Sequence, residues 1–443
     1  MSRYKAYPEY MESGVDWLGL IPQHWNARQL KFLCTCNDEV LGDVKHPEYE
    51  IEYIDIGSVS ASEGINKTET MLFSGAPSRA RRIVRDGDVI ISTVRTYLEA
   101  IASIDNPSPN LIVSTGFAVI RPNQDLHKKF AAYCLRTSGF IKEVIARSVG
   151  VSYPAINASD LIDIKTPLPQ FNEQKKIANF LDYETAKIDT LIAKQQELIK
   201  LLKEKRQAVI SHAVTKGLNP IAPMRDSGVE WLGEVPAHWD VKCIKHLSQV
   251  KRGASPRPID DPKFFDDVGA YAWVRIADVS SAGMYLTSTT QRLSELGSSL
   301  SVKLEPNQLF VSIAGTVGKP CLTISKACIH DGFVYFPSLS INNKFIYYIF
   351  EAGEAFLGLG KMGTQLNLNT DTVGGIKIGL PPKDEVEAIV DFIEKSNKKY
   401  DELVSNANRS VALMQERRTA LISAVVTGKI DVRDEKSSAK EFI

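Results

Sequence analysis

The chain has 443 residues, with 53 basic and 53 acidic side chains and a hydrophobic content of 44%. This is the composition of a folded protein with material for two or three domains, and it excludes a disordered or strongly basic chain. The sequence has no apolar run of about 18 residues, which excludes a transmembrane helix, and its polar start lacks the apolar core of a signal peptide. We therefore expect a cytoplasmic protein without a membrane partner.

The first distinctive stretch is SGVDWLGLIPQHW at 13–25, and it occurs again as SGVEWLGEVPAHW at 227–239. Nine of the thirteen positions are identical, including both tryptophans, the proline and the histidine. Two further pairs of stretches follow in the same order. They are PQFNEQKKIANFLD (169–182) with PPKDEVEAIVDFIE (381–394), and EKRQAVISHAVT (204–215) with ERRTALISAVVT (416–427). The chain is therefore two copies of one unit of about 213 residues.

The first 150 or so residues of each copy hold short β-like runs separated by Gly, Pro, Asn and Ser. YIDIGSVS (53–60) aligns with WVRIADVS (273–280), and DVIIS (88–92) with QLFVS (308–312). The offset between the copies is 214 at the first motif, 220 here, and 212 later. Loops have thus been gained and lost mainly in this part. We expect an α+β fold in which two strand-rich heads diverge inside a shared frame.

Each copy ends in a long helix that begins after a proline stop, TPLPQ (166–170) or GLPPK (379–383). Neither helix contains Gly or Pro over about 42 residues, and apolar residues recur at spacings of 4 and 3. The predicted inward positions are Ile177, Leu181, Ile188, Leu191, Leu198 and Leu202 in the first helix, and Ile389, Ile393, Tyr400, Leu403, Met414 and Leu421 in the second.

The two stripes match in length and register, which favours one antiparallel coiled coil within the chain. The alternative is that each amphipathic helix lies on its own head. The coiled coil predicts two heads held apart by a rod of fixed length. We expect a first head at 1–168, a central helix at 169–216, a second head at 217–380, a C-terminal helix at 381–430 and a polar tail at 431–443.

These three repeated motifs resemble those of the specificity (S) subunits of type I restriction–modification systems. The carriers are S-G-V-[DE]-W-L-G-x-[IV]-P-x-H-W, the P-x-x-x-E-x-x-x-I start of each long helix, and its E-[KR]-R-x-A-[LV]-I-S-x-[AV]-V-T end. The resemblance covers nearly the whole chain. It implies that each head is a target recognition domain for one half of a split, asymmetric site in double-stranded DNA, and that the helices set the unread spacer.

The resemblance also implies which partners and cofactors the chain uses. Methyltransferase (M) subunits, usually two, would dock on the helices, and restriction (R) subunits would join through that complex. S-adenosylmethionine would belong to the M subunits, and ATP and magnesium to the partner subunits. The chain itself would hold no cofactor or metal and would be non-catalytic.

Arginines gather in the first copy in SRARRIVRD (78–86), and Arg95 follows the next strand-like run. Arginine reads guanine edges and holds phosphates, so these residues are candidate DNA contacts, with a solvated charged loop as the alternative. In a late loop of the same copy, Ser152 and Tyr153 are further candidates, with plain turn chemistry as the alternative. The arginines of the first stretch are Arg79, Arg81, Arg82 and Arg85.

The second copy has the shaped loop KRGASPRP (251–258), in which Lys251, Arg252 and Arg257 are candidate contacts, mainly to phosphates. Thr364 and Gln365 align with Ser152 and Tyr153 and complete the predicted set. The four repeated tryptophans and two repeated histidines are interpreted as structural, because contacts that specify different half-sites should differ between the copies.

Two stretches imitate nucleotide-binding motifs. GTVGK (315–319) lacks the first glycine and the Ser or Thr of a phosphate-binding loop, and FLGLG (356–360) stands without any N-P-P-[FY] motif of a methyltransferase. The competing hypothesis is a scaffold protein whose heads bind proteins, which the zero net charge favours. Sequence-dependent DNA binding separates the two hypotheses.

Overall fold

The computed structural model describes residues 4–42, 48–60, 64–357, 359 and 368–434. It divides into two compact units, Met1–Gln195 with Arg409–Ile443 (unit 1) and Gln196–Asn408 (unit 2). The long helices α4 (Phe171–Lys216) and α9 (Lys383–Val426) are each divided between the units, with one segment in unit 1 and the other in unit 2. In the described part of the chain, every helix is too short or too polar to cross a lipid bilayer.

Unit 1 is built on two four-stranded sheets, with strand orders β11-β10-β13-β4 and β8-β5-β12-β9. In the second sheet β12 runs parallel to β5 and antiparallel to β9. The strands are β1 (Tyr10–Glu12), β2 (Leu20–Pro22), β3 (Asn26–Gln29), β4 (Cys34–Cys36), β5 (Glu50–Ile54), β6 (Val59–Ser60), β7 (Gly64–Ile65), β8 (Glu69–Leu72), β9 (Ala80–Ile83), β10 (Val89–Ser92), β11 (Ile101–Ser103), β12 (Leu111–Ser114), β13 (Phe117–Pro122) and β14 (Lys165–Leu168).

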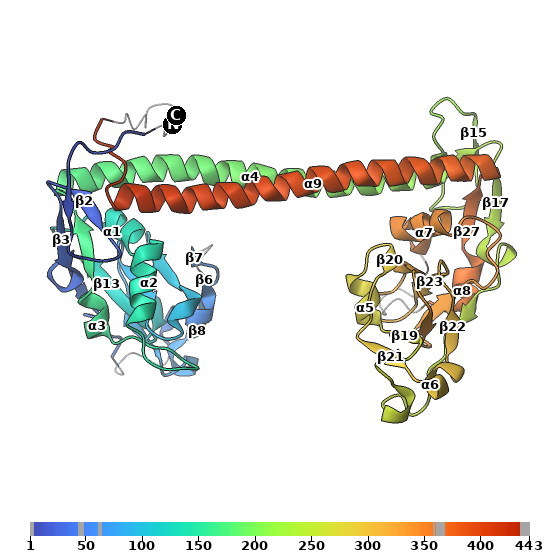
Figure 1. Cartoon of the computed structure of the whole chain (residues 1–443), viewed down its shortest axis with the longest axis horizontal. Helices are drawn as coiled ribbons and strands as arrows, with labels where there is room; N and C mark the ends of the chain where they lie inside the picture. Colours follow the sequence, from blue (N-terminus) through green and yellow to red (C-terminus); the bar gives the residue numbers. More distant parts are fainter. Residues whose placement is uncertain (1–3, 43–47, 61–63, 358, 360–367, 435–443) are drawn as a thin grey trace. The chain divides into compact units, whose positions relative to one another are not determined.

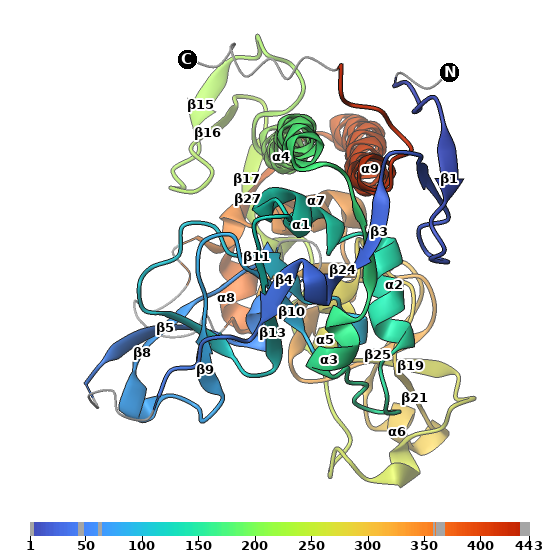
Figure 2. The ribbon, with the colours of Figure 1, turned by 90° about the vertical axis from the view of Figure 1, so that its left-hand side faces the viewer.

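The sheet β11-β10-β13-β4 of unit 1 is covered on both faces. Successive side chains of a strand point to opposite faces, and those of β10 are all buried, so both faces must be covered. Ile91 packs with Phe140 of α2 and Leu161 of α3, whereas its neighbour Ile90 packs with Val113 of the second sheet. Figure 2 shows β10 and β13 between α2 and α3 on one side and β5, β8 and β9 on the other. The short helices are α1 (Lys128–Cys134), α2 (Ser138–Ala146) and α3 (Ala158–Ile162).

Unit 2 carries the labels β19 to β23 in Figure 1 and repeats this plan. Its strand orders are β18-β26-β23-β24-β20 and β21-β19-β25-β22. Its strands are β15 (Met224–Asp226), β16 (Glu234–Pro236), β17 (Asp240–Cys243), β18 (Lys251–Arg252), β19 (Tyr271–Val274), β20 (Tyr285–Leu286), β21 (Gln291–Leu293), β22 (Val302–Leu304), β23 (Leu309–Ser312), β24 (Pro320–Thr323), β25 (Ala327–Ile329), β26 (Phe333–Tyr335) and β27 (Lys377–Leu380). Its short helices are α5 (Ile276–Ser281), α6 (Glu295–Ser299), α7 (Asn343–Ala352) and α8 (Thr370–Gly375).

The equivalence of the two units confirms the sequence alignment. Strand β5 matches β19, because each has a parallel neighbour, and β10 matches β23 at the centre of the other sheet. The predicted α+β class with two strand-rich heads is therefore confirmed.

The repeated motifs meet in one contact that joins each head to a long helix. In unit 1 the buried Trp25 donates its indole N–H to Glu173 at 3.1 Å, and the His24 Nε2 lies 2.9 Å from the same carboxylate. In unit 2 Trp239 and His238 bind Glu385 at 3.1 and 2.8 Å. Glu173 and Glu385 are the acidic residues of P-x-x-x-E, which explains why the tryptophan motif and the helix start repeat together. The structural interpretation of these tryptophans and histidines agrees with this contact.

Helices α4 and α9 pack on each other within each unit. In unit 1 Arg418 of α9 donates to Asp189 of α4 at 2.8 Å, and in unit 2 Arg206 of α4 donates to Asp401 of α9 at 2.7 Å. The numbering falls along one helix as it rises along the other, so the helices are antiparallel. Most of the predicted inward positions are at least half-buried, namely Ile177, Leu181, Ile188, Leu202, Ile389, Ile393, Tyr400, Met414 and Leu421.

The heptad prediction was wrong at Leu191, Leu198 and Leu403. Their side chains are 52%, 42% and 41% exposed. The less exposed residues are the next ones along, among them Ile192. A helix has 3.6 residues per turn, so a strict repeat of 3.5 drifts by about 20° per heptad. After Ile188 the buried stripe advances by four residues where a heptad predicts three, and this step corrects the drift.

Candidate nucleic-acid interface

The carboxyl ends of several strands converge on one edge of unit 1, here called the first strand-end edge (55–60, 93–99, 115–116 and 149–156). The parallel strands β5 and β12 end together. The turn after β12 makes backbone hydrogen bonds with the segments on both sides of it. Thr115 donates its N–H to the Arg79 carbonyl, and Thr93 donates to the Gly116 carbonyl. Ile156 in turn donates to the Thr93 carbonyl, which fixes the late loop beside the others. Loops placed by a rigid sheet in this way are suited to recognition.

Arg95 and Tyr153 meet at this edge, although 58 residues separate them in the sequence. The Arg95 guanidinium lies 4.8 Å from the centroid of the Tyr153 ring, and the ring is 65% exposed. Arg95 has a φ of 50°, a strained left-handed conformation for a residue other than glycine, and such strain often accompanies functional loops. Ser152 is exposed next to them.

Exposed apolar side chains surround this arginine–tyrosine pair. Tyr97 and Leu98 are 51% and 46% exposed, and Val149 and Val151 are 81% and 102% exposed. A cluster of exposed apolar residues with an arginine and aromatic rings is typical of a binding surface. Aromatic rings and guanidinium planes stack on nucleic-acid bases, and arginine also binds phosphates.

The arginines of 78–86 do not form one patch. Arg79 lies at the first strand-end edge and is ion-paired with Asp55 at 3.1 Å. Strand β9 runs antiparallel to β12, so Arg85, beyond its far end, lies at the opposite edge and is ion-paired with Glu39 at 2.7 Å. Between them, the Arg81 guanidinium lies over the Phe73 ring at 4.9 Å, and Arg82 donates to the Asn37 carbonyl at 3.5 Å. The structure therefore brings Arg79 together with Arg95, Ser152 and Tyr153, and separates Arg85 from them.

Unit 2 has the equivalent second strand-end edge (252–257, 275–281, 313–319 and 330–332). Asp331, in the turn between β25 and β26, holds the predicted arginine loop. Its carbonyl accepts from Arg252 at 2.6 Å, and its carboxylate accepts from Ser255 at 2.9 Å and from Arg257 at 3.2 Å. The Arg257 side chain remains 71% exposed, so it is accessible to a ligand. Lys251 is exposed on β18, and Thr364 and Gln365 lie outside the described residues.

Arg275 and Lys319 also belong to this edge, and the sequence predictions missed them. Arg275 is exposed directly after β19 and donates to Gln291, and the Lys319 ammonium donates to the Ser280 carbonyl at 3.0 Å. The alignment of 53–60 with 273–280 contained the signal, because it sets Arg275 against Asp55. The equivalent position thus carries opposite charges in the two units.

His330 and Asp331 give the second strand-end edge its electrostatic character. Burial lowers the pKa of His330, and its Nδ1 accepts the Gly332 N–H at 2.8 Å, which requires that nitrogen to be unprotonated. Burial acts to raise the pKa of Asp331, but the Ser255 hydroxyl and the Arg257 guanidinium outweigh it and hold the pKa below its ordinary value. The residue that fixes the arginine loop is therefore an anion at neutral pH.

Among their described residues, neither edge offers a metal-binding group. Within the described ranges, His, Cys, Asp and Glu side chains form no group suited to a metal ion. What the two edges provide is basic, aromatic and apolar surface on a rigid sheet. The fold and these edges define a two-unit recognition protein with two diverged surfaces.

Comparisons with known proteins give the family. The family model for the type I restriction modification DNA specificity domain matches residues 22–201 and 236–411. The chain is 24% identical to the type I restriction enzyme HindI specificity subunit of Haemophilus influenzae, over 80% of this chain and 89% of that protein. It belongs to the family of type I restriction–modification DNA specificity subunits and is itself non-catalytic.

Solved structures share the fold. A chain from a structure of type I restriction–modification complex assembly has a TM-score of 0.72 at 22% identity, covering 92% of this chain and 98% of that one. The HsdS subunit from Thermoanaerobacter tengcongensis has a TM-score of 0.55 at 21% identity, covering 93% of this chain and 98% of that one.

Proposed function

We propose that each unit reads one half of a two-part DNA target through its strand-end edge. The observation that carries this proposal is the pairing of a frame repeated in both units with edges that differ between them. The joints built on Trp25 and Trp239 are the same in both units, whereas the edges present different groups. A protein whose units read different half-sites needs this combination, because base contacts specify the sequence while the frame only positions them.

In unit 1 the reading group comprises Arg95, Tyr153, Ser152 and Arg79. Arg95 is exposed, and its contact with the Tyr153 ring orients the guanidinium without occupying all its donors. A guanidinium with free donors binds guanine edges or phosphates. Arg79 is held by Asp55, which limits it to a supporting or phosphate-binding role.

In unit 2 the reading group comprises Arg257, Arg252, Arg275 and Lys319. Asp331 fixes the loop that carries the first two, and this reduces the entropy lost when DNA binds. Lys251 supports them as an exposed phosphate contact. Thr364 and Gln365 remain proposed contacts by their alignment with the late loop of unit 1.

The helices α4 and α9 have 46 and 44 residues, and we infer that their length sets the spacer between the half-sites. The methyltransferase subunits, for which two copies are expected, would dock on these helices, and the restriction subunits would join through them. S-adenosylmethionine, ATP and magnesium would be bound by those partners. Deleting a matched heptad from both helices should shorten the tolerated spacer and leave both half-sites unchanged, and an unchanged spacer would contradict this inference.

The test of the DNA-reading proposal is a binding titration of the complete complex with target duplex at several salt concentrations. Arg95→Ala should weaken binding by about tenfold or more, as expected for loss of a base or phosphate contact. Equal affinity of this variant and the wild type for the target would contradict the placement of the interface.

A further inference from the structure

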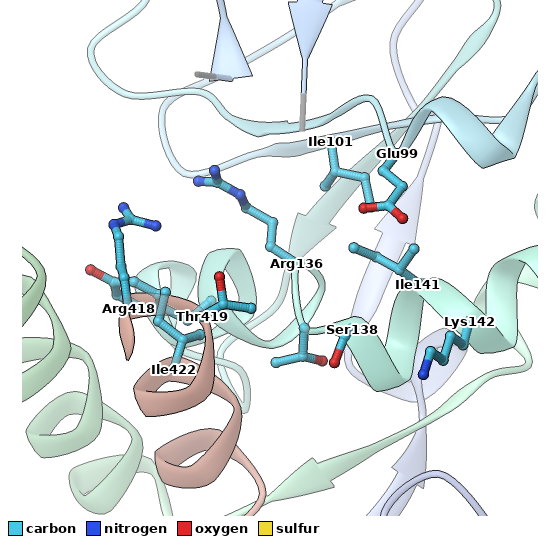
Figure 3. Close-up of a pocket in the computed structure, with 11 residues that line it drawn as sticks. Glu99, Ile101, Arg136, Ser138, Ile141, Lys142, Arg418, Thr419 and Ile422 are labelled. Atoms are coloured by element: carbon cyan, nitrogen blue, oxygen red, sulfur yellow. The ribbon is translucent and has the colours of Figure 1, made fainter. Parts of the chain in front are cut away.

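Unit 1 contains a basic cavity of about 320 Å³ between its head and the C-terminal segment of α9. Figure 3 shows the side chains of Arg136 and Arg418 extending in similar directions on one side of it, with Ser138, Ile141 and Lys142 of α2 on the other side. Glu99 is the one acidic residue among the lining side chains, against three basic ones. The cavity therefore has a surplus of two positive charges.

Arg136 lacks a counter-charge of its own. Among the described residues its guanidinium donates no hydrogen bond, although the side chain is only partly exposed. Burial lowers the pKa of Arg136, and the nearby Arg418 lowers it further. Arg418 does have an ion-pair partner, because its Nε donates to Asp189 at 2.8 Å. A partly buried guanidinium without an ion pair lowers the stability of the fold unless a ligand binds it.

The acidic groups near Arg136 already have donors. Asp182 accepts from the Tyr133 hydroxyl at 2.9 Å and from Lys129 at 2.5 Å, and Asp105 accepts from the Ser103 hydroxyl at 2.9 Å. Both line the neighbouring cavity on the other side of Arg136. They reduce the local positive charge without forming an ion pair with Arg136.

The start of α2 adds to the attraction for an anion. The Thr137 hydroxyl donates to the Cys134 carbonyl, so its side chain does not cap the helix. The first N–H groups of an uncapped helix carry partial positive charge. The hydroxyl groups of Ser138 and Thr419 also line the cavity and supply neutral donors.

We propose that this cavity binds a small phosphate-bearing solute, either inorganic phosphate or the terminal phosphate of a nucleotide, between Arg136, Lys142 and Arg418. Guanidinium groups match the geometry of phosphate oxygens, and the excess of basic over acidic lining residues attracts an anion. The volume exceeds the roughly 30 Å³ share of one water molecule several times over, so a phosphate fits. Arg136 is only partly exposed, and this favours a small ligand.

The corresponding region of unit 2 has the opposite character. There the surface between Tyr348 and α9 is lined by Glu394, Asp401 and Glu402, with Lys398 as its basic residue. A phosphate would be repelled there. We therefore expect one phosphate per chain. The proposal does not depend on where DNA binds.

The test is isothermal titration of the full chain with inorganic phosphate at constant ionic strength. The wild type should bind one phosphate. Arg136→Gln should raise the dissociation constant for phosphate by about tenfold or more, as expected for the loss of a charge-assisted contact. Arg147→Gln is the matched control, because Arg147 directly follows α2, pairs with Glu143 and does not line the cavity. Equal binding by Arg136→Gln and the wild type would overturn the proposal, as would no binding to either phosphate or ATP.

Thermal unfolding separates this role from a purely structural one. Saturating phosphate should raise the Tm of the wild type and the control by about 4 °C, and should leave that of Arg136→Gln unchanged. Without phosphate, Arg136→Gln should not lower the Tm, because it removes a buried charge beside another. A lower Tm for this variant, with the phosphate response retained, would show that the arginine is structural and would overturn the proposal.

A second variant tests the site if Arg136→Gln fails to fold, and two competition experiments identify the ligand. Lys142 is exposed, so Lys142→Gln should fold and weaken phosphate binding about threefold, as a lost ion contact would. Tighter binding of ATP than of phosphate identifies a nucleotide as the ligand, and equal binding identifies phosphate itself. Displacement of phosphate by a duplex without target sequence would assign the cavity to DNA and overturn the proposal.

Discussion

The two joints between head and helix have the same residues and different surroundings. Glu173 in unit 1 has a side chain that is 8% exposed and accepts from Trp25 and from the Tyr7 hydroxyl at 2.8 Å. Glu385 in unit 2 is 25% exposed and lacks the tyrosine. The extra donor comes from the segment before the first repeat, whose Lys5 carbonyl also accepts from Asp431 after α9. One inherited contact has thus become a more buried network in unit 1.

The two strand-end edges show the reverse relation, with the same location and different residues. Unit 1 presents Arg95 on the Tyr153 ring, and unit 2 presents Arg257 on the Asp331 carboxylate. The joints carry the common frame, and the edges carry the differences. Repetition in this chain marks structure, and under the proposed function its divergence marks recognition.

The largest expected effect tests the joints. Glu173→Ala leaves two buried donors, the Trp25 indole and the Tyr7 hydroxyl, without an acceptor and should lower the free energy of unfolding of unit 1 by about 3 kcal/mol. Glu385→Ala should cost unit 2 only about 1 kcal/mol, because water replaces the lost acceptor there. Differential scanning calorimetry measures both, with the exposed Glu204→Ala as the control. Equal losses from the two joint variants would show that the difference in burial has no energetic consequence.

The next effect tests the edges. Arg95→Ala should weaken binding of target DNA by the complete complex by about 1.4 kcal/mol or more, which is roughly tenfold or more. Arg85→Ala removes the same charge at the opposite edge of the same sheet and should weaken binding by less than about twofold. Fluorescence anisotropy at fixed salt measures both affinities. A larger loss from Arg85→Ala would move the interface to the other edge.

A smaller effect tests the packing of the helices. Ile192→Ala removes apolar surface from the buried stripe of α4 and should cost about 1 kcal/mol of unfolding free energy. Leu191→Ala removes a side chain that is 52% exposed and should cost less than about 0.5 kcal/mol. Urea unfolding of the two variants decides between the observed stripe and the strict heptad, which predicts the reverse order.

The smallest effect is the contribution of His330 to the pH dependence of stability. Its pKa is lowered in the fold, so the unfolded chain takes up a proton first as the pH falls below about 6.5. Stability from this residue is fully present above that pH and is lost as the pH falls toward the folded pKa. The Tm of His330→Asn should therefore decline less than that of the wild type between pH 7.5 and 5.5. Parallel declines would indicate that other groups cause the pH dependence.

Much of the frame could be predicted from the sequence, because duplication displays every structural motif twice. The α+β heads, the antiparallel helices and the structural role of Trp25 and Trp239 all follow from matching stretches. The edges were harder to predict, because long-range pairing decides them. Arg85 is paired with Glu39 from 46 residues away, and the direction of β9 separates it from Arg79.

Two further failures have local physical causes. The heptad assigned Leu191 to the stripe because a period of 3.5 and one of 3.6 agree over a few turns and diverge over longer lengths. Arg275 was missed because it stands alone in a strand-like run, where a single arginine has no composition signal. Its alignment with Asp55 was the only clue.

The most direct test of the central claim is single-molecule methylation sequencing of a methylation-free host. The host would express this chain with its methyltransferase partner, as the wild type, as Arg95→Ala with Tyr153→Ala, or as Arg257→Ala with Arg275→Ala. The claim predicts a split methylated motif for the wild type. Each double variant should relax or abolish recognition at one half-site, a different one for each unit. Loss of specificity at the same half-site in both variants, or an unchanged motif in both, would contradict it.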